Sequence, residues 1–344
     1  MHRKRMEDKP MKYVLFGNTG MRVSRFCLGT MTFGGRHGLD LETSTRVVDE
    51  AIDRGVNFID TADSYGKSEE TLGEILTPEK REKVYISTKV FRRHCRDGSV
   101  TRNCRTNIIS ALERSLRNLK TDYVDLYQLH HPDEETPIEE TLATLDTLVK
   151  QGKTRYVGVS NHYAWQMAYM IGAAQARNLE PIVSVQANYN ILDRQIESET
   201  VPFCRKFNVA IMCYSPLCNG ILSGKYLGCE KPPEGTRGEK MSIMWPYLES
   251  EICQGVVKEL DKIAREQGLG MNQLAILWLM AKPYATAIIL GGSRPEHFAQ
   301  IYDIAEKELP PDIVEKIDEI SAPRIHCEFM NQPRRDGFTL AQQR

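Results

Sequence analysis

The sequence has no hydrophobic run long enough to cross a membrane. Its longest unbroken apolar segment covers residues 274–281, whereas a membrane-spanning helix needs roughly 20 apolar residues. We interpret that segment as a buried helix. No apolar stretch follows the basic residues near the N-terminus, so we expect no secretory signal, no membrane partner and a cytoplasmic location.

Metal-binding and nucleotide-binding fingerprints are also missing. The nine cysteines are scattered, with no C-x-x-C pair and no histidine at zinc-finger spacing. This pattern argues against a structural metal and for reduced thiols. No Gly-x-Gly motif follows the first predicted strand, so the Rossmann fingerprint is absent as well.

An excess of one charge is lacking too. The 45 basic and 46 acidic side chains leave a net charge of −1, which provides no overall field for attracting the phosphates of nucleic acid. The short basic segment at residues 2–5 is expected to be a solvated chain end, within a mobile tail over residues 1–10. We therefore expect no nucleic-acid partner.

What the sequence contains is a regular alternation of short apolar runs with longer segments of helical period. A polar hairpin comes first, with strands at residues 12–16 and 21–25 around a glycine-bounded turn. Eight strand-length runs follow, at residues 26–29, 56–60, 84–89, 123–129, 155–159, 183–186, 209–213 and 285–290. Continuous apolar strands that alternate with helices are typical of a parallel sheet covered by helices.

Eight such repeats predict an α/β fold with a single (β/α)8 TIM barrel, which the N-terminal β-hairpin caps, and an open doubly wound sheet is the alternative. The barrel is expected to cover residues 11–322, with a C-terminal extension or tail over 323–344. The longest insertion, at residues 215–250, follows the seventh strand. A structureless stretch of that length is usually a functional lid or a binding loop.

Polar residues recur where the predicted strands end. In a barrel such positions meet on one rim, which is where the active sites of these barrels lie. The set comprises Asp60, Lys89, His130, Ser160, Asn161, Gln186, Tyr214, Gly291, Gly292 and Ser293.

Four residues of this region make sense as one chemical unit: Asp60, Tyr65, Lys89 and His130. A phenol has a pKa of roughly 10, so Tyr65 is a poor acid at neutral pH unless its anion is stabilised. An ammonium group at about 4 Å supplies a gross attraction of about 4 kcal/mol at an effective dielectric near 20, before desolvation is subtracted. Asp60 would hold Lys89 charged, and His130 would orient a substrate carbonyl.

Each residue also has an ordinary structural explanation. Asp60 could cap a turn or a helix, and Tyr65 could anchor a loop. Lys89 could be a surface lysine, and His130 a hydrogen-bonded core residue. Their joint position at successive strand ends favours the catalytic interpretation.

The motifs that carry these residues resemble the aldo-keto reductase family. They occupy residues 57–66, 86–89, 123–130 and 157–161, in the family's order and spacing, and the resemblance runs from about residue 13 to residue 320. Residues 186–190 and 214–217 are most similar to the branch that contains the potassium-channel β subunits and their bacterial relatives.

The resemblance implies a reductase that uses NADP(H) to reduce aldehydes or ketones, with Tyr65 as the general acid, and the reaction could run in reverse. It implies that the nicotinamide carboxamide is held by Ser160, Asn161 and Gln186, and that the ring stacks on Tyr214. Further cofactor contacts are implied at Gly29, Thr30, Ser215, Pro216, Leu217, Gly220, Lys225, Gly291, Ser293, Arg294, His297 and Gln300. The forked donors of Arg294 suit the adenosine 2′-phosphate, which favours NADP over NAD.

One part of the pattern departs from the family. Where the family has a Gln followed by a Glu-Asn pair that holds the adenine, this chain has His297 and then Gln300 and Ile301. Gln300 keeps hydrogen-bonding capacity, but Ile301 cannot replace an amide. The resemblance therefore predicts weaker cofactor binding, or an adenine that is held differently.

Substrate recognition is less determined. A water-poor pocket needs apolar walls, and the candidates are Met31, Phe33, Phe91 and Trp245. The basic run at residues 92–96 follows Lys89. We interpret it as a solvated loop, with an anionic or sugar-phosphate substrate as the alternative.

Two other function classes stay open. A regulatory subunit of a larger complex would bind the cofactor but turn over slowly, because a fold does not fix a function. A metal-dependent barrel enzyme would need carboxylate and histidine ligands on the rim. The sequence has Lys89 where such a ligand would lie, which argues against the metal enzyme. An oligomeric partner is possible, but the sequence indicates no particular one.

Overall fold

Eight parallel strands close into a barrel in the computed structural model, which describes residues 11–34, 38–94, 100–229, 231–240 and 244–322. The predicted tail at 1–10, the extension at 323–344 and part of the basic run, Cys95 and Arg96, lie outside the described residues. The closed barrel confirms the predicted (β/α)8 fold and excludes the open doubly wound sheet.

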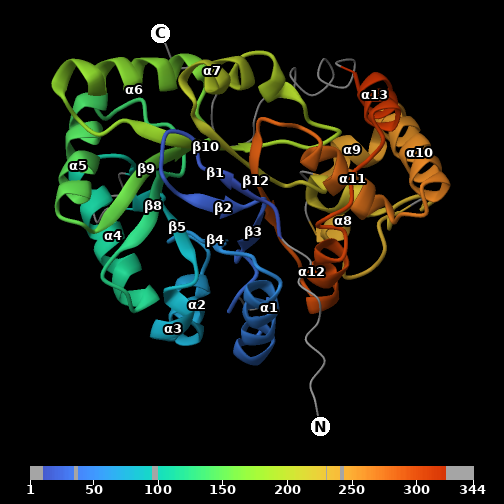
Figure 1. The fold of residues 1–344 in the computed structure, drawn as a ribbon, viewed down its shortest axis with the longest axis horizontal. Helices are drawn as coiled ribbons and strands as arrows, with labels where there is room; N and C mark the ends of the chain where they lie inside the picture. The colour runs from blue at the N-terminus through green and yellow to red at the C-terminus, as the bar shows by residue number, and fades with distance from the viewer. Residues whose placement is uncertain (1–10, 35–37, 95–99, 230, 241–243, 323–344) are drawn as a thin grey trace. The chain divides into compact units, whose positions relative to one another are not determined.

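The barrel strands follow the chain order around the ring, and the last strand pairs with the first (Figure 1). They are β3 (Phe26–Gly29), β4 (Phe58–Asp60), β5 (Tyr85–Val90), β8 (Val124–Leu129), β9 (Thr154–Ser160), β10 (Ile182–Asn188), β11 (Ala210–Tyr214) and β12 (Ala285–Leu290). In register, Asp60 lies opposite Ser87 and Lys89 lies opposite Gln128. The register therefore brings polar side chains of three neighbouring strands to similar heights in the barrel.

Contact clustering divides the chain into two compact units. The first comprises Met1–Asn188, Ile196–Tyr214 and Lys282–Lys307, and it contains the whole barrel. Its helices are α1 (Leu41–Asp53), α2 (Ser68–Ile75), α3 (Pro78–Arg81), α4 (Arg105–Leu119), α5 (Ile138–Lys150), α6 (Ala164–Arg177), α7 (Thr200–Phe207) and α12 (Pro295–Tyr302). The predicted domain limits stay a prediction.

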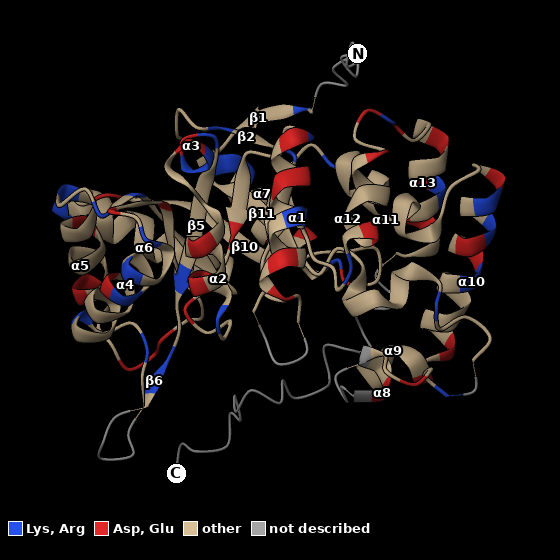
Figure 2. Cartoon of the chain, turned by 90° about the horizontal axis from the view of Figure 1, so that it is seen from below, with Lys and Arg blue, Asp and Glu red and all other residues tan. Residues whose placement is uncertain are grey.

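The helices form where capping and apolar spacing agree. The Asp40 carboxylate accepts the Thr43 N–H at 2.7 Å at the start of α1, which satisfies one of the unpaired donors of a helix end. Along α4, Ile108, Leu112 and Leu116 are buried at four-residue spacing, which is typical of a helix with one apolar face. Figure 2 shows charged residues mainly on the helices, whereas the barrel strands carry few.

The N-terminal hairpin closes one end of the barrel. Strands β1 (Tyr13–Leu15) and β2 (Arg22–Ser24) pair antiparallel and lie across the ring in Figure 1. The Phe16 ring, which has no exposed surface, packs edge-on against Phe58 with centroids 5.4 Å apart. Phe16 belongs to one apolar cluster with barrel residues such as Leu126 and Met212. The predicted cap is therefore present, and it seals the end opposite the strands' carboxyl ends.

A second small hairpin follows β5. Strands β6 (Arg93–His94) and β7 (Val100–Thr101) pair antiparallel, although the sequence predicts only a loop at this position. Each strand is two residues long, too short for the alternation of apolar and polar residues that identifies strands in a sequence. The hairpin carries most of the described part of the basic run.

The second unit comprises Tyr189–Gln195, Ser215–Ala281 and Glu308–Arg344. Its elements are η2 (Cys218–Ser223), α8 (Arg237–Lys240), α9 (Trp245–Glu249), α10 (Glu251–Glu266), α11 (Met271–Met280) and α13 (Pro311–Ile320), and the short η1 (Gln195–Glu197) begins at its boundary. Inside this unit, the buried Trp278 indole donates a hydrogen bond to Asp318 at 2.8 Å. Helix α11 covers residues 274–280 of the apolar run at 274–281, and residues 274–279 are buried, so the predicted buried helix is present. In the described part of the chain, no helix has the length and apolar character that a membrane span requires.

The insertion at 215–250 is not structureless. It contains η2, α8 and α9, which are only four to six residues long, so they leave little periodic signal in the sequence. Pro246 lies in the first turn of α9, where a missing N–H costs nothing. The role of the insertion as a lid or binding loop stays a prediction.

Candidate active site

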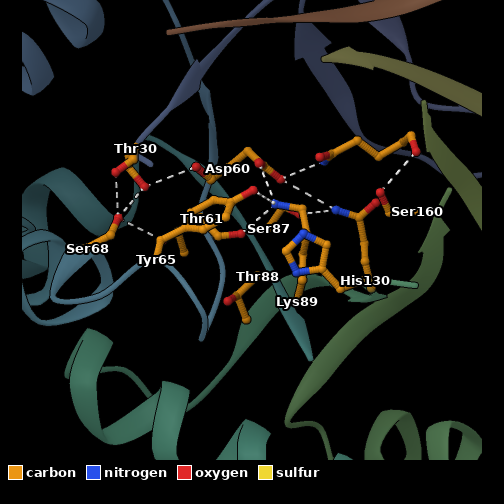
Figure 3. Close-up of polar contacts among 12 residues, drawn as sticks. Thr30, Asp60, Thr61, Tyr65, Ser68, Ser87, Thr88, Lys89, His130 and Ser160 are labelled. Carbon is orange, nitrogen blue, oxygen red and sulfur yellow. Dashed lines mark hydrogen bonds and ion pairs between the residues drawn. The ribbon is translucent and has the colours of Figure 1, made fainter. Parts of the chain in front are cut away.

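A buried ion pair lies at the centre of the polar rim. Lys89 Nζ donates to Asp60 Oδ2 at 2.6 Å and to the carbonyl of Thr61 at 2.7 Å (Figure 3). Lys89 has no exposed surface, which excludes the surface-lysine interpretation. Burial alone would lower the pKa of Lys89, but the charges and hydrogen bonds of Asp60 and Tyr65 outweigh it and raise that pKa. Lys89 is therefore a cation at neutral pH.

The Asp60 carboxylate is held from more than one side. Its Oδ1 accepts a hydrogen bond from Gln186 Nε2 at 2.9 Å and a longer one from Gln128 Nε2 at 3.5 Å. Its backbone carbonyl accepts the Thr30 hydroxyl at 3.1 Å. Asp60 is buried, and a carboxylate that pairs with Lys89 and accepts these hydrogen bonds does not cap a helix.

Tyr65 lies against this ion pair, at the turn that leads from β4 into α2. Its hydroxyl accepts a hydrogen bond from Lys89 Nζ at 3.4 Å, and the same ammonium lies 4.9 Å from the centre of the Tyr65 ring. Burial raises the pKa of Tyr65 above its ordinary value, whereas the Lys89 charge lowers it. Desolvation therefore exceeds the stabilisation of the phenolate by Lys89, and Tyr65 keeps its proton at neutral pH.

His130 completes the group, directly after β8. Its ring meets the Tyr65 ring edge-on with centroids 5.8 Å apart, and it stacks on His131 at 5.1 Å. Burial, the Lys89 charge and His131 lower the pKa of His130 to about 2. The imidazole is therefore neutral, so it can donate a hydrogen bond through one ring nitrogen but is not an acid at physiological pH.

The structure also brings in residues that the sequence analysis does not single out. Gln128 Nε2 donates to Ser87 Oγ at 2.7 Å beneath the ion pair. Ser68 Oγ hydrogen-bonds the Thr30 hydroxyl at 2.7 Å and so supports the segment that holds Asp60. A signal for Gln128 exists, because it is two residues from His130 and alternate residues of a strand point the same way.

A second polar group borders the first at the ends of β9 and β11. Tyr214 Oη donates to Asn161 Oδ1 at 2.7 Å, and Asn161 Nδ2 donates to the His130 carbonyl at 3.0 Å. Ser160 Oγ donates to the Gln186 carbonyl at 3.0 Å. Asn161 has a φ of 60°, the left-handed region that asparagine tolerates better than most residues. Four predicted cofactor contacts thus lie together and are linked to His130.

Other predicted contacts of the first unit follow β12. Gly291, Ser293 and Arg294 are exposed at the start of α12, and Arg294 is its N-terminal capping residue. His297 and Gln300 are exposed on this helix, whereas Ile301 is buried. Ile301 therefore serves packing at the position where the family has an amide.

Gly29 has a structural reason to be glycine. A Cβ atom there would lie 2.7 Å from the side chain of Ile289 and 3.0 Å from the Leu290 carbonyl oxygen. Thr30, which follows it, is buried and bonded to Asp60. Their predicted contacts with a cofactor stay predictions.

In the second unit, the loop from Ser215 to Lys225 has an unusual backbone. Ser215, Cys218, Asn219 and Gly220 all have positive φ, so successive peptide groups turn sharply. Lys225 lies near Gly220, where a Cβ atom would be 3.2 Å from the Lys225 ammonium. The predicted pyrophosphate contacts of Ser215, Pro216, Leu217, Gly220 and Lys225 stay predictions.

The predicted pocket walls differ in exposure. Phe91 is half-buried, and its ring meets His130 with centroids 5.2 Å apart. Phe33 has no exposed surface, whereas Met31 is exposed. In the second unit Trp245 is exposed as well. Among the described residues of the first unit, Phe91 is the predicted wall whose ring contacts His130.

The chain is similar to known proteins over most of its length. Residues 25–322 match the sequence model of the aldo/keto reductase family. The chain is 33% identical over 322 residues to the uncharacterized oxidoreductase YrpG of Bacillus subtilis, which covers 90% of this chain and 96% of that protein.

Two further relatives match almost as well. The aldo-keto reductase YhdN of Bacillus subtilis is 31% identical over 95% of this chain and 99% of its own length. A Schizosaccharomyces pombe protein, named as a candidate voltage-gated potassium channel subunit beta, is 32% identical over 91% of this chain and 94% of its own. These are the branches that the sequence motifs indicate.

Proposed function

The chain belongs to the aldo/keto reductase family and is an oxidoreductase that acts on carbonyl groups, and from that premise we propose that it reduces an aldehyde or ketone to an alcohol with NADPH. The observation that carries the proposal is the Lys89 ammonium, which is buried between the Asp60 carboxylate and the Tyr65 hydroxyl. Tyr65 is the general acid of the proposed reaction.

Tyr65 suits this role because it holds a proton at neutral pH and has a cation beside it. As the phenol gives its proton to the carbonyl oxygen, the negative charge that develops on Tyr65 is stabilised by Lys89, 3.4 Å away. Asp60 keeps Lys89 charged and fixed, so little reorganisation is needed during proton transfer. The site is buried, which strengthens these interactions relative to water.

His130 orients the substrate in this proposal. A neutral imidazole can donate one hydrogen bond to the carbonyl oxygen, and its low pKa prevents it from competing with Tyr65 as the acid. The edge-on contact of the two rings, with centroids 5.8 Å apart, supports a shared role for the two donors. The carbonyl oxygen would then accept one hydrogen bond from each.

The described residues of the first unit fit a nicotinamide cofactor, which supplies a hydride when bound. Ser160 and Asn161 would hold the carboxamide, Gln186 would meet it through its amide oxygen, and the Tyr214 ring would offer a stacking surface. Asn161 ties this group to His130 through a 3.0 Å hydrogen bond. An adenosine 2′-phosphate would suit the start of α12, where the positive end of the helix dipole and Arg294 favour an anion.

A cofactor-binding regulatory subunit is the second candidate, because one relative carries the name of a channel subunit. The complete group of Asp60, Tyr65, Lys89 and His130 favours turnover over a purely regulatory role. Tight NADPH binding without carbonyl reduction would favour the regulatory role instead.

The test is a cofactor titration followed by a substrate panel. Quenching of intrinsic fluorescence would give the Kd values of NADPH and NADH, and oxidation of each cofactor would then be followed with aldehydes, ketones and sugars. We expect tighter binding of NADPH and steady turnover with some members of the panel. Binding of neither cofactor would contradict the proposal.

A further inference from the structure

The residues after β5 form a basic wall beside the candidate active site. Residues Arg92 and Arg102 line the same shallow hollow, and the whole lining comprises Val90, Phe91, Arg92, Arg102, Asn103 and His131. Arg92 leads into β6 and Arg102 follows β7. Figure 2 shows β6, blue where it is basic, projecting beyond the end of β5. The short hairpin thus brings two arginines, ten positions apart in the chain, to one place.

This hollow is next to the group that we assign to the substrate carbonyl. The guanidinium carbon of Arg92 lies 5.4 Å from the centre of the Phe91 ring. The same ring contacts His130, at 5.2 Å between centroids, and His131, at 5.5 Å. Phe91 therefore contacts both the cation and the histidine that we assign to the substrate carbonyl.

The charge of the wall is not neutralised by its neighbours. Within the described ranges, neither Arg92 nor Arg102 forms an ion pair with a carboxylate. Asp133 borders the wall, but it accepts hydrogen bonds from the Asn103 N–H at 2.8 Å, the Glu135 N–H at 3.0 Å and the Thr136 hydroxyl at 2.7 Å. Its charge weakens the positive potential without occupying either guanidinium.

We propose that the preferred substrates are oxo acids, whose carboxylate is bound by Arg92 and Arg102 while the carbonyl lies against His130 and Tyr65. The inference rests on the proposed carbonyl reduction and adds the class of substrate to it. A guanidinium presents paired N–H donors that match the two oxygens of a carboxylate. Phe91 would pack against the short carbon chain between the two ends, since its ring contacts both Arg92 and His130.

The test compares an oxo acid with its uncharged methyl ester. A short aliphatic oxo acid and its methyl ester would be assayed with NADPH in the wild type, Arg92→Gln and Arg102→Gln. A charge-assisted contact of ordinary strength predicts that each variant lowers kcat/KM for the acid by roughly 10- to 100-fold. The ester should change by less than about threefold, because it carries no charge for a guanidinium to bind.

Arg117→Gln is the matched control, since it removes the same charge from an exposed position at the far end of α4, about 18 Å along the helix from Arg105. The inference is supported if the wild type and Arg117→Gln prefer the acid to the ester, and if Arg92→Gln and Arg102→Gln lose that preference. Equal turnover of acid and ester by the wild type, or a preference that survives both variants, overturns it and leaves carbonyl reduction intact. Reduction of neither compound, nor of any member of the wider carbonyl panel, would overturn the proposed function together with this inference.

Discussion

The Asp60–Lys89 ion pair is buried, and its net contribution to stability depends on how the two charges are compensated. Two charges that leave water lose several kcal/mol of hydration each, and their attraction only partly offsets that cost. Here the pair is completed by hydrogen bonds from Gln186 and to the Thr61 carbonyl. Removing one partner would therefore cost more than removing both.

We predict that Lys89→Met lowers the free energy of unfolding by about 3–5 kcal/mol, because the Asp60 carboxylate is then buried without a cation. The double variant Asp60→Asn/Lys89→Met should recover most of that loss. Urea denaturation of the cofactor-free protein measures both values. A single variant as stable as the wild type would show that water reaches Asp60 and that the pair is not isolated from solvent.

A second prediction concerns the proton of His130. Its pKa is about 2 in the folded chain and about 6.5 in an unfolded chain, so the unfolded chain binds more protons between these values. The stability that the neutral ring contributes is fully present above about pH 6.5 and is lost as the pH falls towards 2.

His130→Gln should therefore lose less stability than the wild type between pH 7 and pH 5, by about 1 kcal/mol after a discount for partial exposure of the ring. Urea denaturation at the two pH values measures the difference. The other histidines are common to both proteins and cancel. Equal losses would mean that His130 titrates normally in the folded protein.

At the residue scale, the sequence predicts which side chains meet but not their energetic balance. Asp60, Tyr65, Lys89 and His130 come together because each closes or follows a strand of one barrel. The raised pKa of Tyr65 could not be predicted, since it depends on how far burial exceeds the effect of Lys89. The sequence does not single out Gln128, because an amide inside an apolar strand has no catalytic signature of its own.

At the scale of elements, the hairpin β1–β2 acts as a structural cap rather than as part of the site. We predict that Phe16→Ala lowers the free energy of unfolding by about 3–5 kcal/mol, because it empties a fully buried position beneath the barrel. Leu15→Ala, next to it and 56% exposed, should cost less than about 1 kcal/mol. Thermal unfolding of both variants measures the contrast, and similar losses would contradict the packing described for the hairpin.

We predict that Arg294, at the start of helix α12, determines the preference for NADPH over NADH. Arg294→Ala should raise the Kd of NADPH by roughly 10- to 100-fold, the range expected for a charge-assisted contact with phosphate. NADH lacks the 2′-phosphate, so its Kd should stay within about twofold in the same variant. Fluorescence titration gives both constants. If the Kd values of NADPH and NADH rose by the same factor, Arg294 would not bind the 2′-phosphate.

The sequence predicts those elements that have a clear pattern of apolar residues. All eight barrel strands fall within a few residues of their predicted positions, because buried parallel strands are continuous apolar runs. The hairpin β6–β7 and the helices η2, α8 and α9 are too short to show a period. They are fixed by turns and local contacts instead.

At the scale of the whole molecule, the residues of the proposed chemistry lie in the barrel unit. Asp60, Lys89, Tyr65 and His130 belong to the first unit, as do Ser160, Asn161, Gln186 and Tyr214. The second unit adds the loop from Ser215 to Lys225, with its run of positive φ values. Because the net charge is only −1, the proposed recognition of oxo acids depends on local groups such as Arg92 and Arg102.

The most direct measurement is the single-turnover rate of NADPH oxidation in Tyr65→Phe, with a carbonyl that the wild type reduces. Loss of a general acid should slow this step by about 100-fold or more, while the Kd of NADPH stays within about twofold of the wild-type value. A rate equal to that of the wild type, with cofactor binding intact, would contradict the account, because another group would then supply the proton.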